Sequence, residues 1–554
     1  MEPKALIEQG DHLFEKRGSL LNMWQQLADQ FYPERADFTV SRFLGDEFAD
    51  HLSTSYPLKV RRDLGNSFAS MMRPNSIQWF HIRALREEHE DQPALAWLEW
   101  ATGTQRRAMY DRRSLFTRAS KEADHDLATF GQAVKTVELS RNADRLLFRC
   151  WHLRDCAWCE GADGRIDTVH RKWKPTAQVL VELFGDRVHS KVKEKLLGPS
   201  SNRYTEIPCR HIVIPSSLYD GEYLGKKPLQ SSRNPPFVSI YIDVENKHIM
   251  EAVGQNHFMY VIPRWQTVSG SQYAYSPATI VALPDARLLQ AMTYTLLEAG
   301  EKATNPPMVA VQEAIRSDIA VYAGGVTWVD REYDEKTGEV LRPITQDKSG
   351  LPFGAEMARD IMQQLGEAFF LSKLSLPVNR PEMTAYEVGQ YVQQYIRDAS
   401  PIFEPLEDED NGAVCETTFE LMMQAGAFGS YDDIPQSIRG KEIGFRFESP
   451  LHDAIERRKG NTFAEARALT AEVIAIDPSA IAEVNFREAF RDTLQAIGVP
   501  AKWRNSEEEA DRIVDETKAK QEAAETVDAM AAGADAAGKI ATAANAIDPM
   551  AVAA

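Results

Sequence analysis

Apolar residues recur at helical spacing in one stretch near the middle of the chain, YSPATIVALPDARLLQAMTYTLLEAGEKATNPPM (275–308). Leu288, Met292 and Leu296 follow one another four residues apart, which places their side chains on one face of a helix. A Ser-Pro pair opens the stretch as an N-cap and first turn, and an Asn-Pro-Pro run closes it because proline cannot continue a helix. The pattern predicts an amphipathic helix over 277–303, long enough to act as a strut that needs a packing partner.

A second stretch with the same spacing supplies that partner. Met357, Ile361 and Leu365 again lie four residues apart, and they predict a helix over 354–372. The intervening segment, 304–353, alternates turn residues with short strand-like runs, VTWV and EVLRPI. Since connected helices of similar length pack most economically side by side, we expect an antiparallel pair with a small β unit at its tip.

The first half of the chain divides into a helical part and a strand-rich part. Helical spacing dominates 1–125, and Trp24, Trp79 and Phe80 are expected in its core. From about 126 to 270, apolar and polar residues alternate with a period of two, and the sequence ADGR is typical of a tight hairpin turn. The expected strands are QAVKTVEL, RLLFRCWHL, RIDTVHRKW, RHIVIP and PFVSIYIDV, with a helical run, PTAQVLVELFG, among them. The pattern indicates an α+β fold with a mostly antiparallel sheet.

Helical patterns return in the last third of the chain, with one further strand. Thr384 and Glu387 match the capping box, Thr-x-x-Glu, that opens a helix. Another helical run lies around Cys415–Phe428, and IGFRFES predicts a strand. From Ser506 onward the composition is Glu, Lys, Gln and Ala, and then nearly pure Ala, which predicts a helix with a frayed end or a disordered tail.

Length, charge and cysteine content narrow the class of protein. The 554 residues, 43% of them hydrophobic, can form several cores, while no run of eighteen apolar residues indicates a membrane span and the charged N-terminus is unlike a signal peptide. Five cysteines fit reduced thiols, so we expect synthesis in the cytoplasm. The formal net charge of −19 disfavours simple adhesion to nucleic acid, because phosphate binding relies on Lys and Arg. This charge is still compatible with a protein through which DNA passes without being bound tightly.

Candidate chemistry is sparse. Cys156 and Cys159 form a CxxC motif, but a zinc site needs four ligands, and only Cys150, His152 and His170 could complete one. The local pattern is a strand leading into a turn, not the helix start that activates a redox cysteine. The GxxxxGK[ST] motif is missing, which disfavours an ATP-driven motor, and no Ser/His/Asp arrangement stands out. We therefore expect no metal, no cofactor and no catalytic residue.

One set of charged residues could serve a divalent-metal nuclease: Asp220, Asp243, Glu245 and Lys247. Clustered carboxylates with a lysine can hold two metal ions beside a phosphate. Their loose spacing also suits a solvated turn after the strand PFVSIYIDV, which the sequence favours. The nuclease is the alternative from the enzyme class.

Five short phrases, in this order, carry a resemblance to a known family. They are WQQLADQFYP with a later RPNSIQWF, YSPATIVALPDARLLQ leading to NPPM, the Thr-Ala-x-Glu helix start, FESPLHDA, and GVP ahead of the charged Ala-rich tail. Each phrase is weak alone, but together they span nearly the whole chain. On these phrases the sequence resembles the portal, or head-to-tail connector, proteins of short-tailed bacteriophages.

The resemblance implies a structural virion protein, made in the host cytoplasm, without catalysis, cofactor or membrane contact. Such proteins form a ring, typically of twelve copies, at one capsid vertex, and double-stranded DNA is packaged and ejected through its channel. The implied partners are further copies of the chain, the terminase motor, the major capsid or scaffold protein, and the tail adaptor. A tail-adaptor or scaffold ring protein is a further alternative, which a different ring symmetry would reveal.

The resemblance also divides the chain into the parts of a portal fold, with a helical stem, a small β clip, an α+β wing and a helical C-terminal crown. The expected parts are the wing (1–276), a stem helix (277–303), the clip (304–353), a second stem helix (354–372), a tunnel loop (373–383), wing and crown helices (384–500), and a crown helix with the Ala-rich tail (501–554). The stem would pack through Leu288, Met292, Leu296, Met357, Ile361 and Leu365.

Two further expectations follow from this division. The tunnel loop would face DNA, with Lys373, Asn379 and Arg380 as candidate contacts. The acidic run at 406–410 departs from the family pattern and is expected to interrupt a long helix.

Two physical considerations agree with a ring. A pair of struts leaves lateral faces bare in one subunit, and neighbouring copies would cover them. Twelve copies would carry a net charge of about −228, so the channel would repel phosphate and any grip would come from a few local cations.

Overall fold

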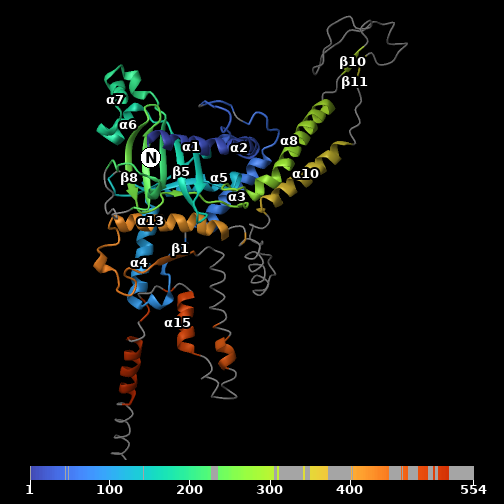
Figure 1. Cartoon of the computed structure of the whole chain (residues 1–554). Coiled ribbons are helices and arrows are strands. Elements are labelled where there is room, and N and C mark those ends of the chain that lie inside the picture. The colour runs from blue at the N-terminus through green and yellow to red at the C-terminus, as the bar shows by residue number, and fades with distance from the viewer. Residues whose placement is uncertain are drawn as a thin grey trace, which may run out of the picture. The chain divides into compact units, whose positions relative to one another are not determined.

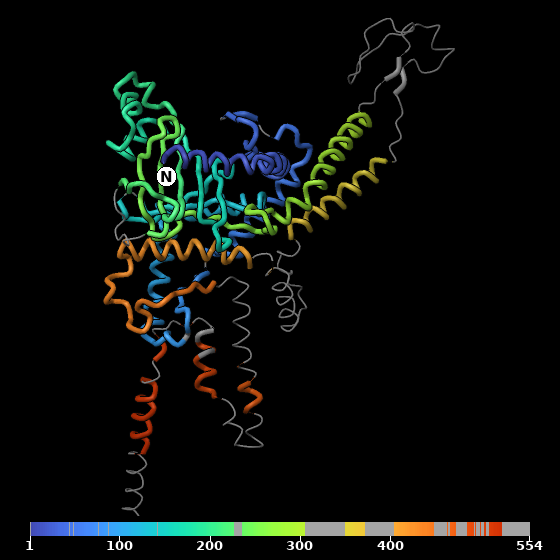
Figure 2. The backbone as a smooth tube through the Cα atoms, in the orientation of Figure 1, coloured from blue at the N-terminus to red at the C-terminus, as the bar shows by residue number. Residues whose placement is uncertain are grey.

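The computed structural model of the chain divides into two compact units (Figures 1 and 2). One unit comprises Met1–His81, Thr102–Gly429 and Phe445–Asp453, and the other comprises Ile82–Ala101, Ser430–Gly444 and Ala454–Ala554. The structure describes residues 2–304 except 44, 48, 76, 141 and 226–234, then 308–310, 341–343, 350–371, 401, 404–447, 463, 466–471, 485–496, 499, 503–505 and 509–522.

Helices at the start of the first unit surround an aromatic core. They are α1 (Pro3–Lys16), α2 (Gly18–Phe31), α3 (Tyr56–Met72) and α5 (Phe116–Phe130), and α4 (Gln92–Met109) has its C-terminal part in this unit. Trp24, Trp79 and Phe80 are fully buried, which confirms the prediction from sequence. The Trp24 ring lies edge-on to Phe130 and Tyr273, with ring centroids 6.4 and 6.1 Å away. The N-terminal helices therefore share one core with the segment that precedes the helix predicted over 277–303.

Two antiparallel sheets confirm the predicted α+β class. The larger has the strand order β4-β5-β6-β7-β8, with β4 (Cys156–Glu160), β5 (Ile166–Trp173), β6 (Cys209–Pro215), β7 (Phe237–Asp243) and β8 (His248–Gln255). The smaller has the order β3-β2-β9, with β2 (Val134–Leu139), β3 (Leu146–Trp151) and β9 (Tyr260–Val261). The helical run expected between strands is α6 (Ala177–Phe184), and α7 (Ser190–Leu197) follows it.

Turns and edges account for the differences between the predicted and observed strands. The predicted hairpin turn joins β4 to β5, and Gly164 in it has a φ of 72°, which glycine adopts readily. The sequence pattern does not indicate β8, because two of its inward positions carry the small residues Ala252 and Gly254. Short 3₁₀ turns connect the elements: η1 (Pro33–Arg35), η2 (Glu87–His89), η3 (Leu153–Asp155), η4 (Gly185–Arg187), η5 (Ser200–Tyr204), η6 (Ser216–Leu218) and η9 (Tyr431–Asp433).

The two expected struts are present. They are α8 (Pro277–Thr304) and α10 (Gly350–Ala368), and β10 (Met308–Ala310) and β11 (Leu341–Pro343) lie between them in sequence. α10 begins at Gly350 and not at 354, because Pro352 falls in the first turn, where a helix needs no backbone donor. β11 lies within the predicted strand EVLRPI, whereas VTWV lies outside the described residues.

The acidic run at 406–410 does not interrupt the helix, so that expectation is wrong. Residues 404–406 are helical, Glu407–Gly412 form a π-helical stretch, and α13 (Ala413–Gln424) continues from it, where a helical run was predicted. The π-helical stretch widens the turn, and Asp410 within it is fully buried. Asp410 is therefore part of the core, and the helix continues through the acidic run.

The remaining described elements are β1 (Phe80–Ala84), β12 (Ile443–Phe447), α15 (Phe486–Ala496) and helices over 466–471 and 509–522. β12 coincides with the predicted strand IGFRFES, and 509–522 is the start of the charged run for which a helix was predicted. The capping box at Thr384 and Glu387, and the Ala-rich sequence after residue 522, lie outside the described residues. Of the helices described, none has both the length and the hydropathy needed to cross a membrane.

Candidate functional site: a helical hairpin and its anchors

α8 and α10 form an antiparallel helical hairpin (Figure 1). After α8 the chain enters β10, and β11 returns it to α10; the two strands pair antiparallel, with Met308 opposite Pro343 and Ala310 opposite Leu341. The helices approach closely at Gly354, where an added Cβ would lie 2.9 Å from Cδ2 of Leu296. The expected antiparallel pair is therefore confirmed, and of the small β unit at its tip the structure describes these two strands.

The first half of α8 is embedded in the core of the first unit. Its buried residues on the inward face are mostly alanines, which allow close packing: Ala278, Ala282, Ala286 and Leu289. Ser276 caps the helix by accepting a hydrogen bond from the Thr279 backbone N–H at 3.4 Å. The Ser276 and Thr279 hydroxyls donate to the backbone carbonyls of Ala128 and Thr129 at 2.8 and 2.7 Å. These bonds fix the start of α8 to the end of α5.

A second anchor holds the hairpin at the middle of α8. The Gln290 side-chain oxygen accepts hydrogen bonds from the backbone N–H groups of Ser53 and Thr54 at 2.7 and 2.9 Å, and its amide donates to the Thr54 carbonyl at 3.0 Å. Beyond α10, Phe369 is fully buried and its ring centroid lies 5.3 Å from that of Phe31. Both helices are therefore fixed at their base.

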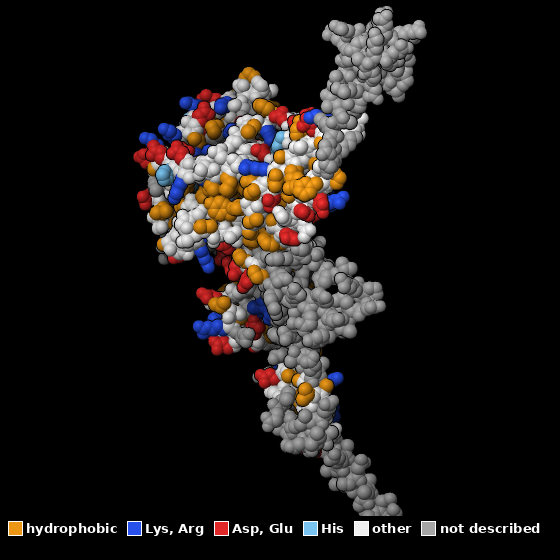
Figure 3. All heavy atoms as spheres, turned by 90° about the vertical axis from the view of Figure 1, so that its right-hand side faces the viewer, with side chains coloured by type: hydrophobic (Ala, Val, Ile, Leu, Met, Phe, Trp, Pro, Cys, Tyr) orange, Lys and Arg blue, Asp and Glu red, His pale blue; other side chains and the backbone are white. Residues whose placement is uncertain are grey.

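The outer part of the hairpin exposes apolar side chains. Of the residues expected to pack the stem, Ile361 and Leu365 are buried and Met292 and Leu296 are partly buried, whereas Leu288 is 49% exposed and Met357 is 41% exposed. Leu289, and not Leu288, faces the core, because with 3.6 residues per turn it lies on the same side of α8 as the buried alanines. Figure 3 views the molecule from the side on which the hairpin lies in Figure 1 and shows orange side chains gathered in patches on that side of the molecule.

The exposed apolar residues of the hairpin occur on both helices. They are Ile280, Val281, Leu288, Tyr294 and Leu297 on α8, and Phe353 and Met357 on α10. We call this set the hairpin face. Leu297 is 58% exposed, and a leucine loses about 1.5–3 kcal/mol of burial free energy when it is left in water. Exposed apolar side chains of this size on two neighbouring helices indicate surfaces that another protein covers.

A buried cluster of charges lies where the π-helical stretch meets the core. The Asp410 carboxylate accepts a hydrogen bond from Arg73 at 2.8 Å and forms an ion pair with Lys135, and Arg73 also pairs with Asp124. Arg73 further donates to the Asn411 side chain at 2.9 Å. All these side chains are buried. Ion pairs shielded from solvent therefore connect α3, α5 and β2 to the long helix, as we call the continuous helical run over 404–424.

The two carboxylates of this cluster differ in their charge partners. Burial would raise the pKa of Asp410, but Lys135 and Arg73 together hold it below its ordinary value. Burial raises the pKa of Asp124, which has Arg73 as its strongest cationic neighbour. Burial alone would lower the pKa of Arg73, and the two carboxylates raise it instead. Asp410 is therefore ionised and central to the cluster. The sequence pattern does not reveal this role, because Asp410 follows three other acidic residues and only its position in the fold distinguishes it.

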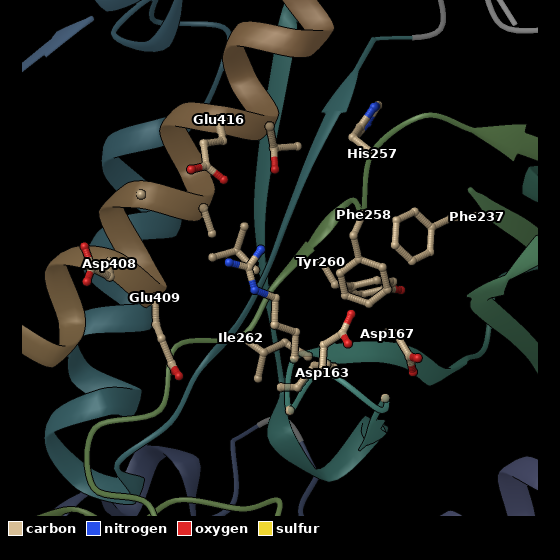
Figure 4. Close-up of a pocket in the computed structure, with 18 of the residues that line it drawn as sticks. Asp163, Asp167, Phe237, His257, Phe258, Tyr260, Ile262, Asp408, Glu409 and Glu416 are labelled. Atoms are coloured by element: carbon tan, nitrogen blue, oxygen red, sulfur yellow. The ribbon is translucent and has the colours of Figure 1, made fainter. Parts of the chain in front are cut away.

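A hollow of about 800 Å³ lies beside the long helix in the same unit (Figure 4). Its acidic lining residues are Asp163, Asp167, Asp408, Glu409, Glu416 and Glu420, and we call it the acidic hollow. Phe258 and Tyr260 form an aromatic wall opposite the helix that carries Glu416. Arg264 pairs with Glu409 at 3.1 Å and with Glu160, so part of the charge is offset within the chain.

The structure does not assemble the candidate nuclease residues into a metal site. Asp243 is buried and accepts a hydrogen bond from the Asn246 side chain at 2.7 Å, while Asp220, Glu245 and Lys247 are exposed. Among the described residues, no three His, Cys, Asp or Glu side chains could hold a metal ion together.

The CxxC motif lies on a strand and not at a helix start, as expected. Cys156 is fully buried in β4, and burial raises the pKa of its thiol to about 12. Residues three apart on a strand point to opposite faces, so Cys159 does not share a face with Cys156. Burial also raises the pKa of Cys159. Both thiols are therefore in the unreactive, protonated form.

Comparison with known proteins identifies the family of this chain. The family model for bacteriophage head to tail connecting proteins matches residues 4–504. The chain belongs to this family. The probable portal protein of Bordetella phage BPP-1 is 25% identical over 463 residues, which cover 82% of this chain and 80% of that protein. The portal protein of Salmonella phage epsilon15 is 22% identical over 544 residues, covering 96% of this chain and 93% of that protein.

Solved structures give a more distant likeness. A chain in the virion of a native gene transfer agent particle aligns with a TM-score of 0.34 and 9% identity, over 75% of this chain and 86% of that chain. The family resemblance seen in the sequence phrases is confirmed by the family model and the two phage relatives.

One predicted site of this connector cannot be compared with the structure. Lys373, Asn379 and Arg380, the candidate DNA contacts of the tunnel loop, lie outside the described residues, as does most of the expected clip.

Proposed function

We propose that this chain is the portal of a phage particle. Copies assemble into a ring at one capsid vertex, and the ring forms the channel through which double-stranded DNA is packaged and ejected. Membership of the connector family supports this function. The observation that carries it in this chain is the hairpin face, an exposed apolar surface on helices that are fixed at their base.

A ring explains why the hairpin face is apolar. α8 and α10 pack against each other and against the core, and each helix keeps exposed leucine, tyrosine, phenylalanine or methionine residues on its remaining surface. A neighbour placed by rotation about a channel axis buries the face of one copy against the next, and the arrangement closes on itself. In this proposal Leu288, Leu297 and Met357 pack between copies, whereas Ile361 and Leu365 pack within one copy.

The parts of the chain then take the roles that the family resemblance implies. The hairpin is the stem, the segment between its helices is the clip, and the residues that follow it are a tunnel loop facing DNA through Lys373, Asn379 and Arg380. The N-terminal α+β part is the wing, and the C-terminal helices are the crown. The ring has twelve copies and binds the terminase, the capsid or scaffold protein and the tail adaptor.

The proposed portal acts without catalysis of its own. The exposed carboxylates Asp220 and Glu245 do not form a metal site with the buried Asp243, which supports a portal without catalysis over a nuclease. Metal-dependent cleavage of DNA by the purified chain would support the nuclease instead. A tail-adaptor or scaffold ring would differ in rotational symmetry when the particles are averaged by electron microscopy.

A substitution on the hairpin face tests the proposed assembly. Leu297→Asp introduces a charge into the interface between copies, so we expect loss of rings with retention of the folded monomer. Leu197→Asp is the matched control, because Leu197 is 88% exposed and lies at the end of α7, away from the hairpin. Mass photometry gives the fraction of assembled chain. Equal ring formation by both variants would exclude the hairpin face as the interface.

A further inference from the structure

The small sheet of the first unit has two edges of different chemistry. Its strand order is β3-β2-β9, so β3 and β9 are the outer strands. In the register of the sheet, Thr136 on the central strand pairs with Arg149 on one side and with Tyr260 on the other. Arg149 and Tyr260 therefore lie in one row, at opposite edges. Residues next to β3 are therefore separated from residues next to β9 by the width of the three-stranded sheet.

The β3 edge is rich in arginine. The backbone N–H of Phe148 donates to the carbonyl of Ser114 at 2.8 Å, which brings the α4–α5 loop against this strand. Three arginines of this edge form ion pairs with partly exposed carboxylates of the same chain: Arg113 with Asp111 at 3.4 Å, Arg145 with Asp144 at 3.5 Å and Arg118 with Glu122 at 3.0 Å. The arginines of the loop, the start of α5 and β3 form the arginine edge: Arg112, Arg113, Arg118, Arg145 and Arg149. Five arginines against the three paired carboxylates leave this edge with an excess of positive charge.

An exposed leucine lies within the arginine edge. Leu115 has a φ of 61° and a ψ of 17°, a left-handed conformation that leucine rarely adopts, and its side chain is 42% exposed. This conformation costs free energy without burying the side chain within its own chain. Apolar residues flanked by arginine are typical of protein interfaces, in which arginine is enriched.

The β9 edge adjoins the acidic hollow. Tyr260, Val261 and Ile262 all line it, and the long helix forms its far side. The carboxylates of Glu416 and Glu420 lie one helical turn apart, and the walls of the hollow raise the pKa of both; in Glu420 the charge of Glu416 adds to the effect. Arg165 offsets part of the charge of Glu416. The hollow therefore favours an incoming cation.

We propose that the arginine edge of one copy docks into the acidic hollow of the next copy in the ring. Two arginine edges would repel each other, as would two acidic hollows, so this pairing disfavours a twofold dimer and favours head-to-tail assembly. Leu115 lies against the aromatic wall formed by Phe258 and Tyr260. This inference rests on the proposed ring, and it adds a second, charge-selective contact to the apolar contact of the hairpin face.

A charge-reversal cycle tests the pairing on the full-length chain. One variant carries Arg113→Glu with Arg145→Glu, a second carries Glu416→Lys with Glu420→Lys, and a third carries all four changes. The protein concentration at half assembly, measured by mass photometry, should rise about tenfold or more in each of the first two variants. In the third variant it should return to within about threefold of the wild type, because each interface again joins opposite charges.

Matched controls separate this effect from folding. Arg203→Glu and Glu194→Lys reverse exposed charges elsewhere in the same unit and should leave assembly unchanged. Near-ultraviolet circular dichroism reports whether each monomer is folded. If a reversal variant fails to fold, a bismaleimide cross-link between a Leu115→Cys chain and a Glu416→Cys chain tests the contact instead. It should yield a covalent dimer, and Leu115→Cys mixed with Leu197→Cys should not.

Each outcome decides between the two proposals or against both. Wild-type chain that forms no rings overturns the proposed function and this inference with it. Rings that tolerate the single-side reversals, or that fail to recover in the four-fold variant, overturn the inference alone. Loss of DNA binding with normal assembly in the arginine variant would assign the arginine edge to DNA and also overturn it. For the cross-link, absence of the dimer from assembled rings has the same meaning.

Discussion

Arg73 donates a hydrogen bond to Asp410 at 2.8 Å, and both side chains are buried although 337 positions separate them in the sequence. This bond ties the end of α3 to the start of the long helix. Because Arg73 also pairs with Asp124, and Asp410 with Lys135, the helix is held in one position by four charges. The cluster therefore sets how the C-terminal elements of the first unit join its core.

Removing the Asp410 carboxylate should destabilise the chain strongly. Asp410→Ala leaves Lys135 without its carboxylate and Arg73 with one carboxylate instead of two, and breaking a buried pair in this way costs about 3–5 kcal/mol. Asp408→Ala, two residues earlier in the same acidic run, removes an exposed carboxylate and should change the free energy of unfolding by less than about 0.5 kcal/mol. Denaturant unfolding of the two variants measures the difference. Equal losses would show that the cluster does not hold the helix.

The connection between α5 and α8 should tolerate no side chain at Gly131. Gly131 has a φ of 73°, and an added Cβ would lie 2.0 Å from the backbone carbon of Tyr275, just before the cap of α8. Gly164 has a φ of 72° with open space around it. Gly164→Ala should therefore cost about 1–2 kcal/mol for the backbone conformation. Gly131→Ala should cost roughly 1–3 kcal/mol more for the clash. Equal losses of unfolding free energy for Gly131→Ala and Gly164→Ala would contradict the close approach of Gly131 to the Tyr275 backbone.

Stability should fall as the pH drops below about 6.5, in part because of His170. This side chain is fully buried in β5, its two ring nitrogens have no hydrogen-bond partner among the described residues, and it faces Arg210 and Asp11. Burial, with the charge of Arg210, lowers its pKa to about 3. The unfolded chain then binds a proton that the folded chain excludes, so stability is present above the unfolded pKa and is lost as the pH falls through it.

A substitution isolates the contribution of that histidine. Between pH 6.5 and pH 5 the native chain should lose about 2 kcal/mol through His170, at about 1.4 kcal/mol per pH unit. His170→Gln should show a correspondingly shallower dependence, whereas a substitution at the exposed His12 should leave the dependence in place. An identical pH dependence in the native chain and His170→Gln would show that this imidazole titrates normally.

The two cations of the proposed tunnel loop should affect DNA and not assembly. Replacing Lys373 and Arg380 together with Gln removes the positive charges expected to face DNA in an otherwise acidic channel. Rings should form normally, while particles should retain less packaged DNA. The matched pair Lys191→Gln with Arg203→Gln removes the same charge from α7 and η5 and should have no effect on retention. Normal retention in the tunnel-loop variant would exclude the proposed role.

Much of the architecture could be predicted because its signals are local. The Ser-Pro cap and the 3.6-residue period marked α8 to within one residue, and alternation marked five of the strands. The resemblance phrases indicated the family, which the family model confirms. These features depend on neighbours in sequence, where pattern and structure correspond directly.

The charged contacts could not be predicted, because they depend on which residues meet in space. Asp410 is one of four consecutive acidic residues, and only the π-helical turn distinguishes it from the exposed Asp408. Leu288 and Leu289 are adjacent, so the period alone did not decide which one faces the core. Arg113 and Arg145 belong to different elements and come together through the bond between Ser114 and Phe148. Such placements arise from tertiary packing and leave little trace in a local pattern.

The mass and symmetry of the assembled wild-type chain test the central claim most directly. A ring of twelve copies of the 62.3 kDa chain has a mass of about 750 kDa, and electron microscopy should show a closed ring with a central channel and the hairpins of neighbouring copies in contact. A chain that stays monomeric or dimeric at the concentrations used for electron microscopy would contradict the account, as would a ring in which the hairpin faces remain exposed.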